Sequence, residues 1–423
     1  MPEKQRNWAG NTVYNAARLH RPATIEQVQE LVSRCNKLRI LGSRHSFNGI
    51  ADCNEDLISL EKLDQVVALD RERHTVTIEG GVRYGQLCQY LQREGYALHN
   101  LASLPHISVA GACATATHGS GNNNGNLATA VTALEFVNAR GEVVALSREQ
   151  HGEQFHGAVV GLGGLGAVTK LTLEIEPTFD MSQDVYENLP LPQLENHFDE
   201  ITARAYSVSL FTDWQNASFN QVWLKRRVTE ESAGVSSSTF FGATPAPTHR
   251  HPIITISAEN CTAQMGIPGP WYERLPHFRI GFTPSSGEEL QSEYMLPRQY
   301  AVAAIQAINR LRDQIIPLLQ ISEVRTIAAD ALWMSPCYQQ SCIAIHFTWV
   351  KDWPAVKQLL PLLEEQLAPF QARPHWGKLF TLPPAQVQVL YKRLPDFQDL
   401  LRHYDPQDKF RNTFLDSYIF RAD

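Results

Sequence analysis

The sequence predicts an α+β fold of two lobes. At 423 residues and 43% hydrophobic content, the chain is long enough to form more than one hydrophobic core. Short strand-like runs and helices alternate without a regular βαβ period, and no GxGxxG lies between a strand and a helix. Both observations argue against a doubly wound dinucleotide-binding fold. The character of the sequence changes near Pro177, where we expect the first lobe to end.

The first lobe is expected to mix short strands with helices. Thr24 and, three residues later, Gln27 form a capping-box pattern at the start of a helix over 25–37. A second helix is expected over 86–93, after a glycine-containing turn. Further strands are expected over 38–41, 57–60, 66–69, 75–78 and 168–175.

The second region has the pattern of an antiparallel sheet backed by helices. A helix over 298–316 carries apolar residues at helical spacing, and Pro317 should end or kink it. Strands are expected over 206–211, 221–224, 321–327 and 341–350, and another helix over 353–367. Such a sheet could cover a substrate site at the junction of the lobes.

The composition excludes several classes of function. The net charge of −7 argues against nucleic acid or an anionic membrane as a partner. No apolar run approaches the roughly 20 residues that a membrane helix needs. The seven cysteines form no CxxC pair, so neither a zinc site nor a disulfide framework is indicated. We therefore expect a protein of the reducing cytoplasm.

Residues 39–48, Arg-Ile-Leu-Gly-Ser-Arg-His-Ser-Phe-Asn, form the first candidate site. Gly42 and Ser43 let the backbone approach a ligand closely, and successive N–H groups in such a turn can bind an anion such as pyrophosphate. His45 would then place a nucleophilic imidazole beside that ligand. The alternative is a plain connection in which His45 is a surface or capping residue.

Residues 101–121 form the second candidate site and are rich in Gly, Ala, Ser and Thr. Small side chains over such a length indicate that something large lies against the backbone. A tightly packed internal loop is the alternative. Ser103, Ser108 and the amides of residues 111–114 are the candidate donors to a ligand.

Together the two stretches resemble the flavin-binding signatures of the vanillyl-alcohol-oxidase superfamily of FAD-linked oxidases, most closely the alditol (xylitol) oxidases. The resemblance covers nearly the whole chain, including residues 7–11, 373–378 and 405–410. It implies a two-lobed FAD-binding (PCMH-type) domain with a substrate cap. The FAD-binding domain would span 1–178, the cap 179–370, and a C-terminal segment, 371–423, would return to the FAD-binding domain.

The resemblance also implies FAD bonded covalently to His45, and no metal. The turn departs from the wider superfamily at Arg44, where many relatives carry glycine, and a bulky side chain there restricts the backbone. The residues expected to contact the cofactor are Ile40, Leu41, Gly42, Ser43, Arg44, His45, Ser46, Ser103, Ser108, Gly111, Ala112, Cys113, Ala114, His118, Val168 and His375.

The candidate substrate site begins with Glu323 and Arg325, which fall on one face of a predicted strand, and Thr348 could share that face. An exposed cross-strand ion pair would be the usual explanation of such a pattern. The resemblance instead matches these positions, with Ser103 and Lys378, to the polyol-binding residues of alditol oxidases. Such a mixed set of donors and acceptors satisfies a row of hydroxyls without a metal.

Arg325 and Lys378 are the expected catalytic residues, because preorganised cations stabilise a developing alkoxide. Burial beside Arg325 would depress the pKa of Lys378 and make it the candidate proton acceptor, although Glu323 opposes that shift. The resemblance implies oxidation of the C1 primary hydroxyl of a polyol such as xylitol or sorbitol to the aldose, with O₂ reduced to hydrogen peroxide.

Two other hypotheses stay open. One is an aldonolactone oxidase or dehydrogenase of the same fold, and the other is a flavin-binding protein without turnover. In the favoured hypothesis the partners are a small polyol and O₂, with neither nucleic acid nor a membrane, and the chain is a monomer.

Overall fold

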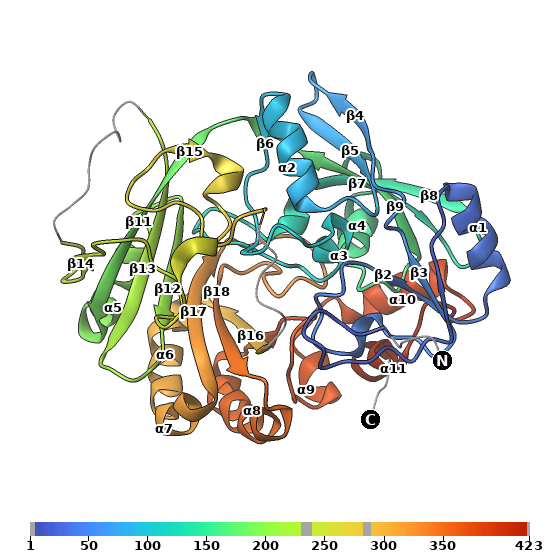
Figure 1. Ribbon diagram of the computed structural model, residues 1–423. Coiled ribbons are helices and arrows are strands. Elements are labelled where there is room, and N and C mark those ends of the chain that lie inside the picture. Colours follow the sequence, from blue (N-terminus) through green and yellow to red (C-terminus); the bar gives the residue numbers. More distant parts are fainter. Residues whose placement is uncertain (1–4, 230–238, 282–288, 421–423) are drawn as a thin grey trace.

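The computed structural model describes residues 5–229, 239–281 and 289–420. Within these ranges the strands form four sheets, arranged as two lobes that meet along a central seam (Figure 1). No helix in the described ranges combines the length and the apolar character needed to cross a membrane.

The first lobe contains a parallel sheet of order β1-β3-β2 and an antiparallel sheet of order β4-β5-β9-β7-β8. A two-stranded ribbon joins β6 to β10. The elements are β1 (Arg18–His20), α1 (Ile25–Arg34), β2 (Leu38–Leu41), β3 (Asp56–Ser59), β4 (Val66–Asp70), β5 (Thr75–Glu79), α2 (Tyr84–Arg93), β6 (Tyr96–Ala97), α3 (Val109–Ala114), β7 (Val131–Val137), β8 (Val143–Ser147), α4 (Arg148–Val159), β9 (Ala167–Glu174) and β10 (Glu176–Pro177). The absence of a doubly wound order among these sheets agrees with the sequence.

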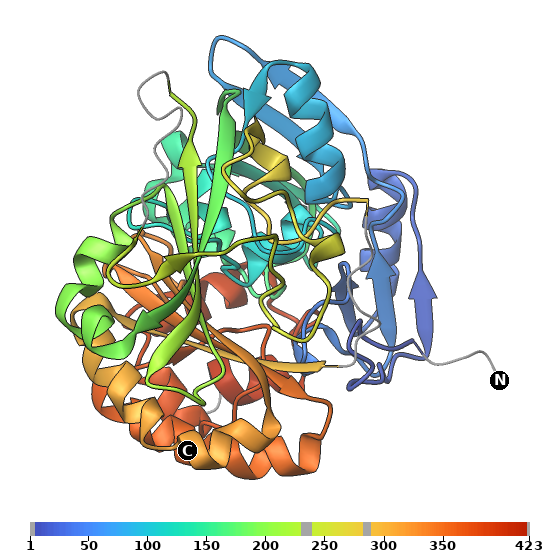
Figure 2. The same cartoon turned by 60° about the vertical axis from the view of Figure 1, so that its left-hand side comes forward.

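The second lobe is built on a nine-stranded antiparallel sheet of order β14-β11-β13-β12-β17-β18-β16-β19, with β15 paired to β11. Its elements are β11 (Asp180–Pro190), α5 (Leu191–Thr202), β12 (Ser207–Thr212), β13 (Ser218–Arg227), β14 (Thr244–Pro245), β15 (Gly269–Pro270), β16 (Glu289–Pro297), α6 (Ala301–Asn309), α7 (Arg312–Ile315), β17 (Leu319–Ile327), β18 (Cys342–Val350), α8 (Trp353–Leu367) and β19 (Arg373–Pro374). The predicted antiparallel sheet backed by helices is confirmed. Figures 1 and 2 show α5, α6 and α8 along the outer face of this sheet.

The two faces of the large sheet differ in character. The outward face carries apolar side chains that pack in one core with the helices: Val208, Leu210, Val222, Leu224, Val324, Ile345 and Phe347. Each such side chain contributes about 1.5–3 kcal/mol when fully buried, so this face fixes the register of the strands. Because side chains alternate, every second residue of the same strands points to the opposite face, toward the first lobe.

After β19 the chain returns to the first lobe through α9 (Pro384–Gln388), α10 (Leu394–Tyr404) and α11 (Thr413–Leu415). Phe397 and Leu401 share a core with Phe136 of β7. The backbone N–H of Leu38 donates to the carbonyl of Lys409 at 2.9 Å. The domain limits at 178 and 371 stay predictions. The strand β19 lies after the second limit, yet it pairs with β16 of the large sheet.

The predicted helix over 298–316 is wrong in its continuity. The structure breaks it into a 3₁₀ turn, Arg298–Tyr300, then α6, α7 and a second 3₁₀ turn, Ile316–Leu318, that contains Pro317. Leu311 has φ −92° and ψ 3°, which interrupts the helix between its two α-helical pieces. On either side of the interruption, Ile305 and Ile315 are buried in the same core.

Candidate active site

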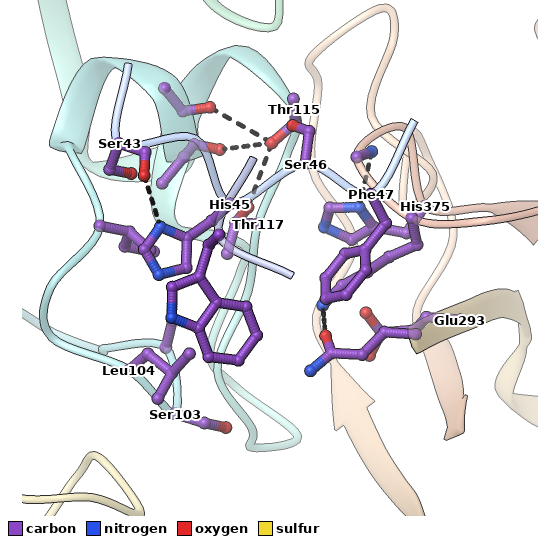
Figure 3. Close-up of a pocket in the computed structure, with 18 of the residues that line it drawn as sticks. Ser43, His45, Ser46, Phe47, Ser103, Leu104, Thr115, Thr117, Glu293 and His375 are labelled. Atoms are coloured by element: carbon purple, nitrogen blue, oxygen red, sulfur yellow. Dashed lines mark hydrogen bonds between the residues drawn. The ribbon is translucent and has the colours of Figure 1, made fainter. Parts of the chain in front are cut away.

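A cavity of about 510 Å³ lies between the lobes and is lined by both. One wall is formed by residues 39–47, the loop after residue 102, and α3. The opposite wall is formed by β16, β17, β18 and residues 375–378. Figure 3 shows His45 with its loop on one side of this space and Glu293 with His375 on the other. The cavity therefore joins the two stretches singled out in the sequence to the predicted substrate site.

The loop after β2 holds His45 in a fixed orientation. Its Nδ1 lies 3.0 Å from the carbonyl oxygen of Ser43, and its ring stacks on Trp8 with centroids 5.4 Å apart. Burial lowers the pKa of His45 to about 4, so the ring is neutral and carries a lone pair at neutral pH. A neutral, oriented imidazole can act as a nucleophile.

Arg44 adopts a left-handed backbone conformation with φ 65°. This conformation favours glycine and costs about 1–2 kcal/mol for other residues. Two contacts offset the cost: the Trp8 N–H donates to the Arg44 carbonyl at 2.8 Å, and the guanidinium donates to Gln5 at 2.9 Å. The bulky Arg44 therefore adopts the strained conformation that the turn requires, and these two contacts stabilise it.

The small residues of both loops leave room for a large group. A Cβ added to Gly42 would lie 2.8 Å from the Ser108 hydroxyl, and one added to Gly111 would lie 2.7 Å from it. That buried hydroxyl has no hydrogen-bond partner among the described residues. The Ser43 hydroxyl accepts from the Ser108 N–H at 3.1 Å. An unpaired donor beside two glycines fits a cofactor that lies along this wall.

The stretch expected to offer free amides forms a short helix instead. The Ala112 N–H donates to the Ser108 carbonyl at 3.0 Å and is therefore not available to a ligand. Val109 and Cys113, four residues apart, point into the hydrophobic core, as helical periodicity requires. Cys113 thus lies outside the cavity lining.

The wall formed by the large sheet is a row of polar side chains in register. Glu323 of β17 pairs with His346 of β18, which pairs in turn with Glu293 of β16. Thr348 pairs with Gln291 in the next row on this face. All five side chains line the cavity. The alternation predicted for Glu323, Arg325 and Thr348 therefore places them together, buried rather than on an exposed surface.

Glu293 is the acceptor at the centre of this wall. One of its oxygens lies 2.8 Å from Arg325, 3.2 Å from His118 and 3.6 Å from His346. Burial alone would raise the pKa of Glu293, but His118, Arg325 and His346 outweigh burial and hold it well below its usual range. Glu293 is therefore an anion that orients Arg325.

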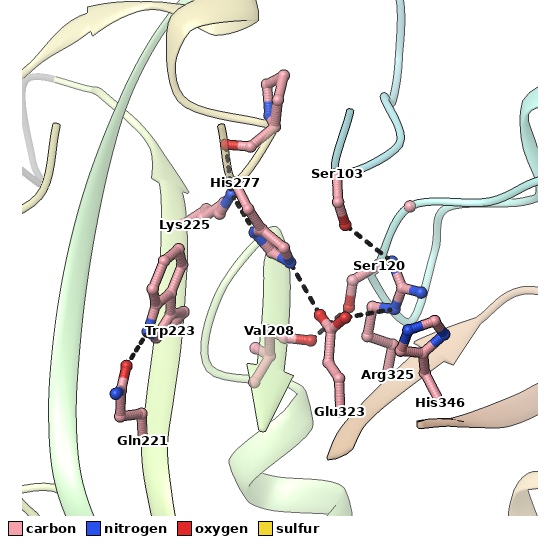
Figure 4. Close-up of polar contacts among 12 residues, drawn as sticks. Ser103, Ser120, Val208, Gln221, Trp223, Lys225, His277, Glu323, Arg325 and His346 are labelled. Atoms are coloured by element: carbon pink, nitrogen blue, oxygen red, sulfur yellow. Dashed lines mark hydrogen bonds and ion pairs between the residues drawn. The ribbon is translucent and has the colours of Figure 1, made fainter. Parts of the chain in front are cut away.

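Glu323 accepts from the Nε2 of His277 at 2.9 Å, and its other oxygen lies 3.5 Å from Arg325 (Figure 4). Burial opposes ionisation here too, but Arg325 and His277 hold the pKa of Glu323 well below its usual range. Arg325 also reaches the Ser103 hydroxyl at 3.4 Å, which links this wall to the loop of the first lobe.

Lys378 enters the cavity from the segment that follows β19. Its ammonium donates to Gln291. Burial, which Arg325 reinforces, lowers the pKa of Lys378, whereas Glu293 opposes the shift. His375 accepts from the Gly377 N–H at 3.0 Å, and burial lowers its pKa to about 3. Both side chains therefore favour their neutral forms more than in water.

The structure brings nearly all the predicted site residues to one cavity. Those that line it are Ile40, Leu41, Gly42, Ser43, Arg44, His45, Ser46, Ser103, Ser108, Gly111, Ala112, Ala114, His118, Glu323, Arg325, Thr348, His375 and Lys378. Cys113 and Val168 are not in this lining. Val168 lies on β9, and its carbonyl packs against Gly80, so that it belongs to the sheet of the first lobe.

The polar cavity residues missed in the sequence include Gln291, Glu293, His277 and His346. The strand alternation Gln-Ser-Glu over 291–293 and His-Phe-Thr over 346–348 carried a signal for three of them. His277 lies in an irregular segment and had no such signal.

One cluster of potential metal ligands, His20, Cys35 and Asp56, occurs in the described ranges. Arg18 donates to both oxygens of Asp56 at 2.7 Å, and His20 lies 2.7 Å from one of them. The carboxylate is already satisfied, so these contacts explain the cluster as an ion pair at the edge of the parallel sheet.

Comparison with known proteins gives matches along the whole chain. A sequence profile of FAD binding domains matches residues 16–147, and one of D-arabinono-1,4-lactone oxidases matches residues 287–418. The alditol oxidase of Streptomyces sp. (strain IKD472 / FERM P-14339) is 49% identical over 412 residues, which are 97% of each chain. An L-gulono-1,4-lactone dehydrogenase of Mycobacterium tuberculosis is 27% identical and covers 96% of this chain and 97% of its own.

Among solved structures, cholesterol oxidase from B. sterolicum superposes with a TM-score of 0.77 at 15% identity, covering 98% of this chain and 96% of that one. At this identity the likeness shows the fold, and it confirms the predicted two-lobed FAD-binding (PCMH-type) architecture. Fold and cavity thus define an FAD-dependent oxidoreductase. With a relative 49% identical along its length, the chain belongs to the vanillyl-alcohol-oxidase superfamily of FAD-linked oxidases.

Proposed function

We propose that the protein is a covalent FAD-dependent alditol oxidase, which oxidises the C1 primary hydroxyl of a polyol such as xylitol or sorbitol to the aldose and reduces O₂ to hydrogen peroxide. The observation that carries the proposal is the set formed by buried Glu323, Arg325 and Thr348 and partly buried Lys378, which faces His45 across one cavity. The 49% identity to an alditol oxidase along nearly the whole chain supports the same substrate class.

The cofactor is FAD, held along the wall of the first lobe and bonded to His45. Its neutral imidazole, fixed by Ser43 and Trp8, supports this role. The unpaired Ser108 hydroxyl and the space beside Gly42 support the placement of the ring system. Bound there, the flavin would supply the acceptor for the hydride that leaves the alcohol carbon.

On the opposite wall, Arg325 and Lys378 bind the reacting hydroxyl. Arg325 is held in place by Glu293 at 2.8 Å, so its charge is oriented before the substrate arrives. Such preorganised cations stabilise negative charge on the reacting oxygen. Lys378 accepts the hydroxyl proton, because burial brings its pKa below the ordinary value for lysine. Glu323, Thr348 and Ser103 bind the remaining hydroxyls.

Reduction of the bound flavin by alditols under anaerobic conditions tests the proposal. We expect xylitol or sorbitol to bleach the flavin absorbance, and readmitted air to restore it with one peroxide formed per turnover. The flavin colour should stay with the protein after acid precipitation. A flavin that alditols do not reduce would overturn the proposed function.

An aldonolactone oxidase or dehydrogenase is the second candidate, favoured by the lactone oxidase profile over residues 287–418. Parallel assays with L-gulono-1,4-lactone and xylitol separate the two, because the proposed site should reduce the flavin faster with the polyol. Dependence on an acceptor other than O₂ would favour a dehydrogenase.

We further propose that the chain acts as a monomer in the cytoplasm. All seven cysteines are free and buried, which supports a reducing compartment. The mass in solution, measured by light scattering, tests the oligomeric state.

A further inference from the structure

Lys225 of β13 is a buried cation outside the cavity lining. Lys225 is only 1% exposed. Among the described residues, no carboxylate lies within ion-pair distance of its ammonium, and the nearby Glu323 pairs with His277 instead. The ammonium instead lies 2.6 Å from the carbonyl of Leu275, 3.1 Å from that of Pro276 and 3.2 Å from Nδ1 of His277. Three donors thus face three acceptors.

These contacts determine the tautomer of His277. An ammonium has three N–H donors and no acceptor, so the Nδ1 that faces it must accept. The proton of a neutral His277 then resides on Nε2, which lies 2.9 Å from an oxygen of Glu323. Burial, reinforced by Lys225, lowers the pKa of His277 to about 4, so the ring is neutral at neutral pH. The chain therefore runs as donor to acceptor from Lys225 through His277 to Glu323 (Figure 4).

The geometry around His277 is rigid. Its ring packs edge-on against Trp223 at 5.1 Å and against Phe211 at 5.5 Å. These two residues lie on β13 and β12, and Phe211 pairs directly with Glu323 of β17. Neighbouring strands thus place Lys225 and Glu323 on the cavity-facing side of one sheet, and His277, from the irregular segment before β16, lies between them. The aromatic rings keep the imidazole in the plane needed to reach both partners.

We propose that Lys225 and His277 form a buried donor chain that holds Glu323 as an oriented acceptor for one hydroxyl of the substrate. Lys225 is a positioning residue in this chain, because it acts on the substrate only through His277. The proposal rests on the proposed function, in which Glu323 binds a polyol hydroxyl. It makes polyol recognition depend on Lys225, a residue that does not line the cavity.

The chain makes recognition by Glu323 depend on the charge of Lys225. Burial lowers the pKa of Lys225 to about 7, against the opposing effect of Glu323. The other groups that face Lys225 are Cys261, Arg274, Arg325 of β17, and His277 itself. Above its pKa, Lys225 loses one donor, so one of its three acceptors, which include Nδ1 of His277, is left without a donor.

Lys225→Met tests the proposal, with Arg226→Met as the matched control. Arg226 is the next residue of the same strand, points to the other face and pairs with Asp184 at 2.6 Å. In anaerobic flavin reduction, Lys225→Met should raise the half-saturating xylitol concentration about tenfold and leave the limiting rate within about threefold. The control should change neither. Wild type should bind xylitol more weakly above about pH 7, and Lys225→Met should lose that dependence.

Single deoxy derivatives of the alditol identify the hydroxyl concerned. For the derivative that lacks the hydroxyl bound by Glu323, wild type and Lys225→Met should have equal half-saturating concentrations. His277→Phe keeps the ring volume and provides a second variant. It should weaken xylitol binding as Lys225→Met does, and the double variant should be no worse than either single one. Additive effects, or a variant that loses only thermal stability, would overturn the proposal.

A measurement without substrate separates this inference from the proposed function. In ¹⁵N-histidine-labelled holoprotein, the His277 signals, assigned by their loss in His277→Phe, should show a neutral ring protonated at Nε2 near pH 6.5. Lys225→Met should shift the Nδ1 signal, because the ammonium that donates to Nδ1 is gone. If alditols fail to reduce the wild-type flavin, the proposed function falls, and these spectra alone decide whether the donor chain exists. A ring protonated at Nδ1 would disprove it.

Discussion

The two walls of the cavity use different means to hold what lies between them. Around Gly42 and Gly111 the wall of the first lobe is made of small side chains, with the unpaired Ser108 hydroxyl and the neutral imidazole of His45. The wall of the large sheet is crowded with buried charges, with Arg325 between Glu293 and Glu323. A large planar group is bound mainly by shape and close backbone approach, whereas small hydroxylated molecules need oriented donors and acceptors. A change in one wall should therefore leave the task of the other intact.

Replacing His45 tests the first wall and should have the largest effect. His45→Ala removes the nucleophilic ring, so we expect no covalently bound flavin. Acid-denatured protein should show no flavin fluorescence on its gel band, whereas wild type should. Trp8→Phe, which keeps a ring for stacking, is the control and should retain the band. Fluorescence that persists in His45→Ala would assign the bond to another residue.

Replacing Lys378 tests the second wall. Lys378→Met should slow the limiting rate of anaerobic flavin reduction by about 10²–10³-fold, the usual effect of losing a charge-stabilising donor. Flavin content should not change. Lys351→Met, at the exposed residue that follows β18, is the control. A higher half-saturating concentration with an intact limiting rate would make Lys378 a binding residue only.

The pH profile of the same reaction separates Lys378 from His346 as the proton acceptor. An acceptor works only when it is unprotonated, so the rate rises with pH up to its pKa. Burial lowers the pKa of both groups, below 10.5 for Lys378 and below 6.5 for His346. With Lys378 as acceptor, Lys378→Met should abolish the rise of the rate with pH. A rise that persists in Lys378→Met would favour His346.

Glu323→Gln should have a smaller effect, confined to binding. In the proposed function the carboxylate holds a remote hydroxyl equally before and during reaction, so the half-saturating xylitol concentration should rise about tenfold, or about 1.4 kcal/mol, with little change in the limiting rate. Glu187→Gln, in a partly exposed ion pair of the same sheet, is the control. A large fall in the limiting rate would instead place Glu323 at the reacting centre.

The smallest effect is expected from Gly42→Ala. The added methyl group would meet the Ser108 hydroxyl at 2.8 Å, which the loop can relieve by a small shift. We expect the ratio of flavin to protein absorbance to fall and the protein to lose about 1 kcal/mol of stability. Gly49→Ala, with no atom within 4 Å of its added Cβ, should change neither quantity.

The two walls also differ in how well the sequence predicted them. The residues of the loop at His45 follow one another in the sequence, so a local pattern could predict them. Strand alternation placed Glu323 and Arg325 on one face. His277 was missed because it lies in an irregular segment and its partner Glu323 is 46 residues away in the sequence. The helix at Val109–Ala114 was missed because glycine and alanine fit both a loop and a tightly packed helix. Local sequence patterns thus predicted helices and strands. The charge network depends on which residues lie opposite one another in neighbouring strands, and local patterns do not give that register.

The return of the C-terminal segment has a consequence for biosynthesis. Lys409 donates to the carbonyl of Val32, 377 residues earlier, and the Phe47 N–H donates to the carbonyl of Gly377. At about 5–20 residues per second, the ribosome makes these partners roughly 20–75 s apart. The His45 loop therefore waits for the end of the chain before its surroundings are complete. Attachment of a cofactor there would report that synthesis has finished, and a nascent chain cut short before residue 377 would remain colourless.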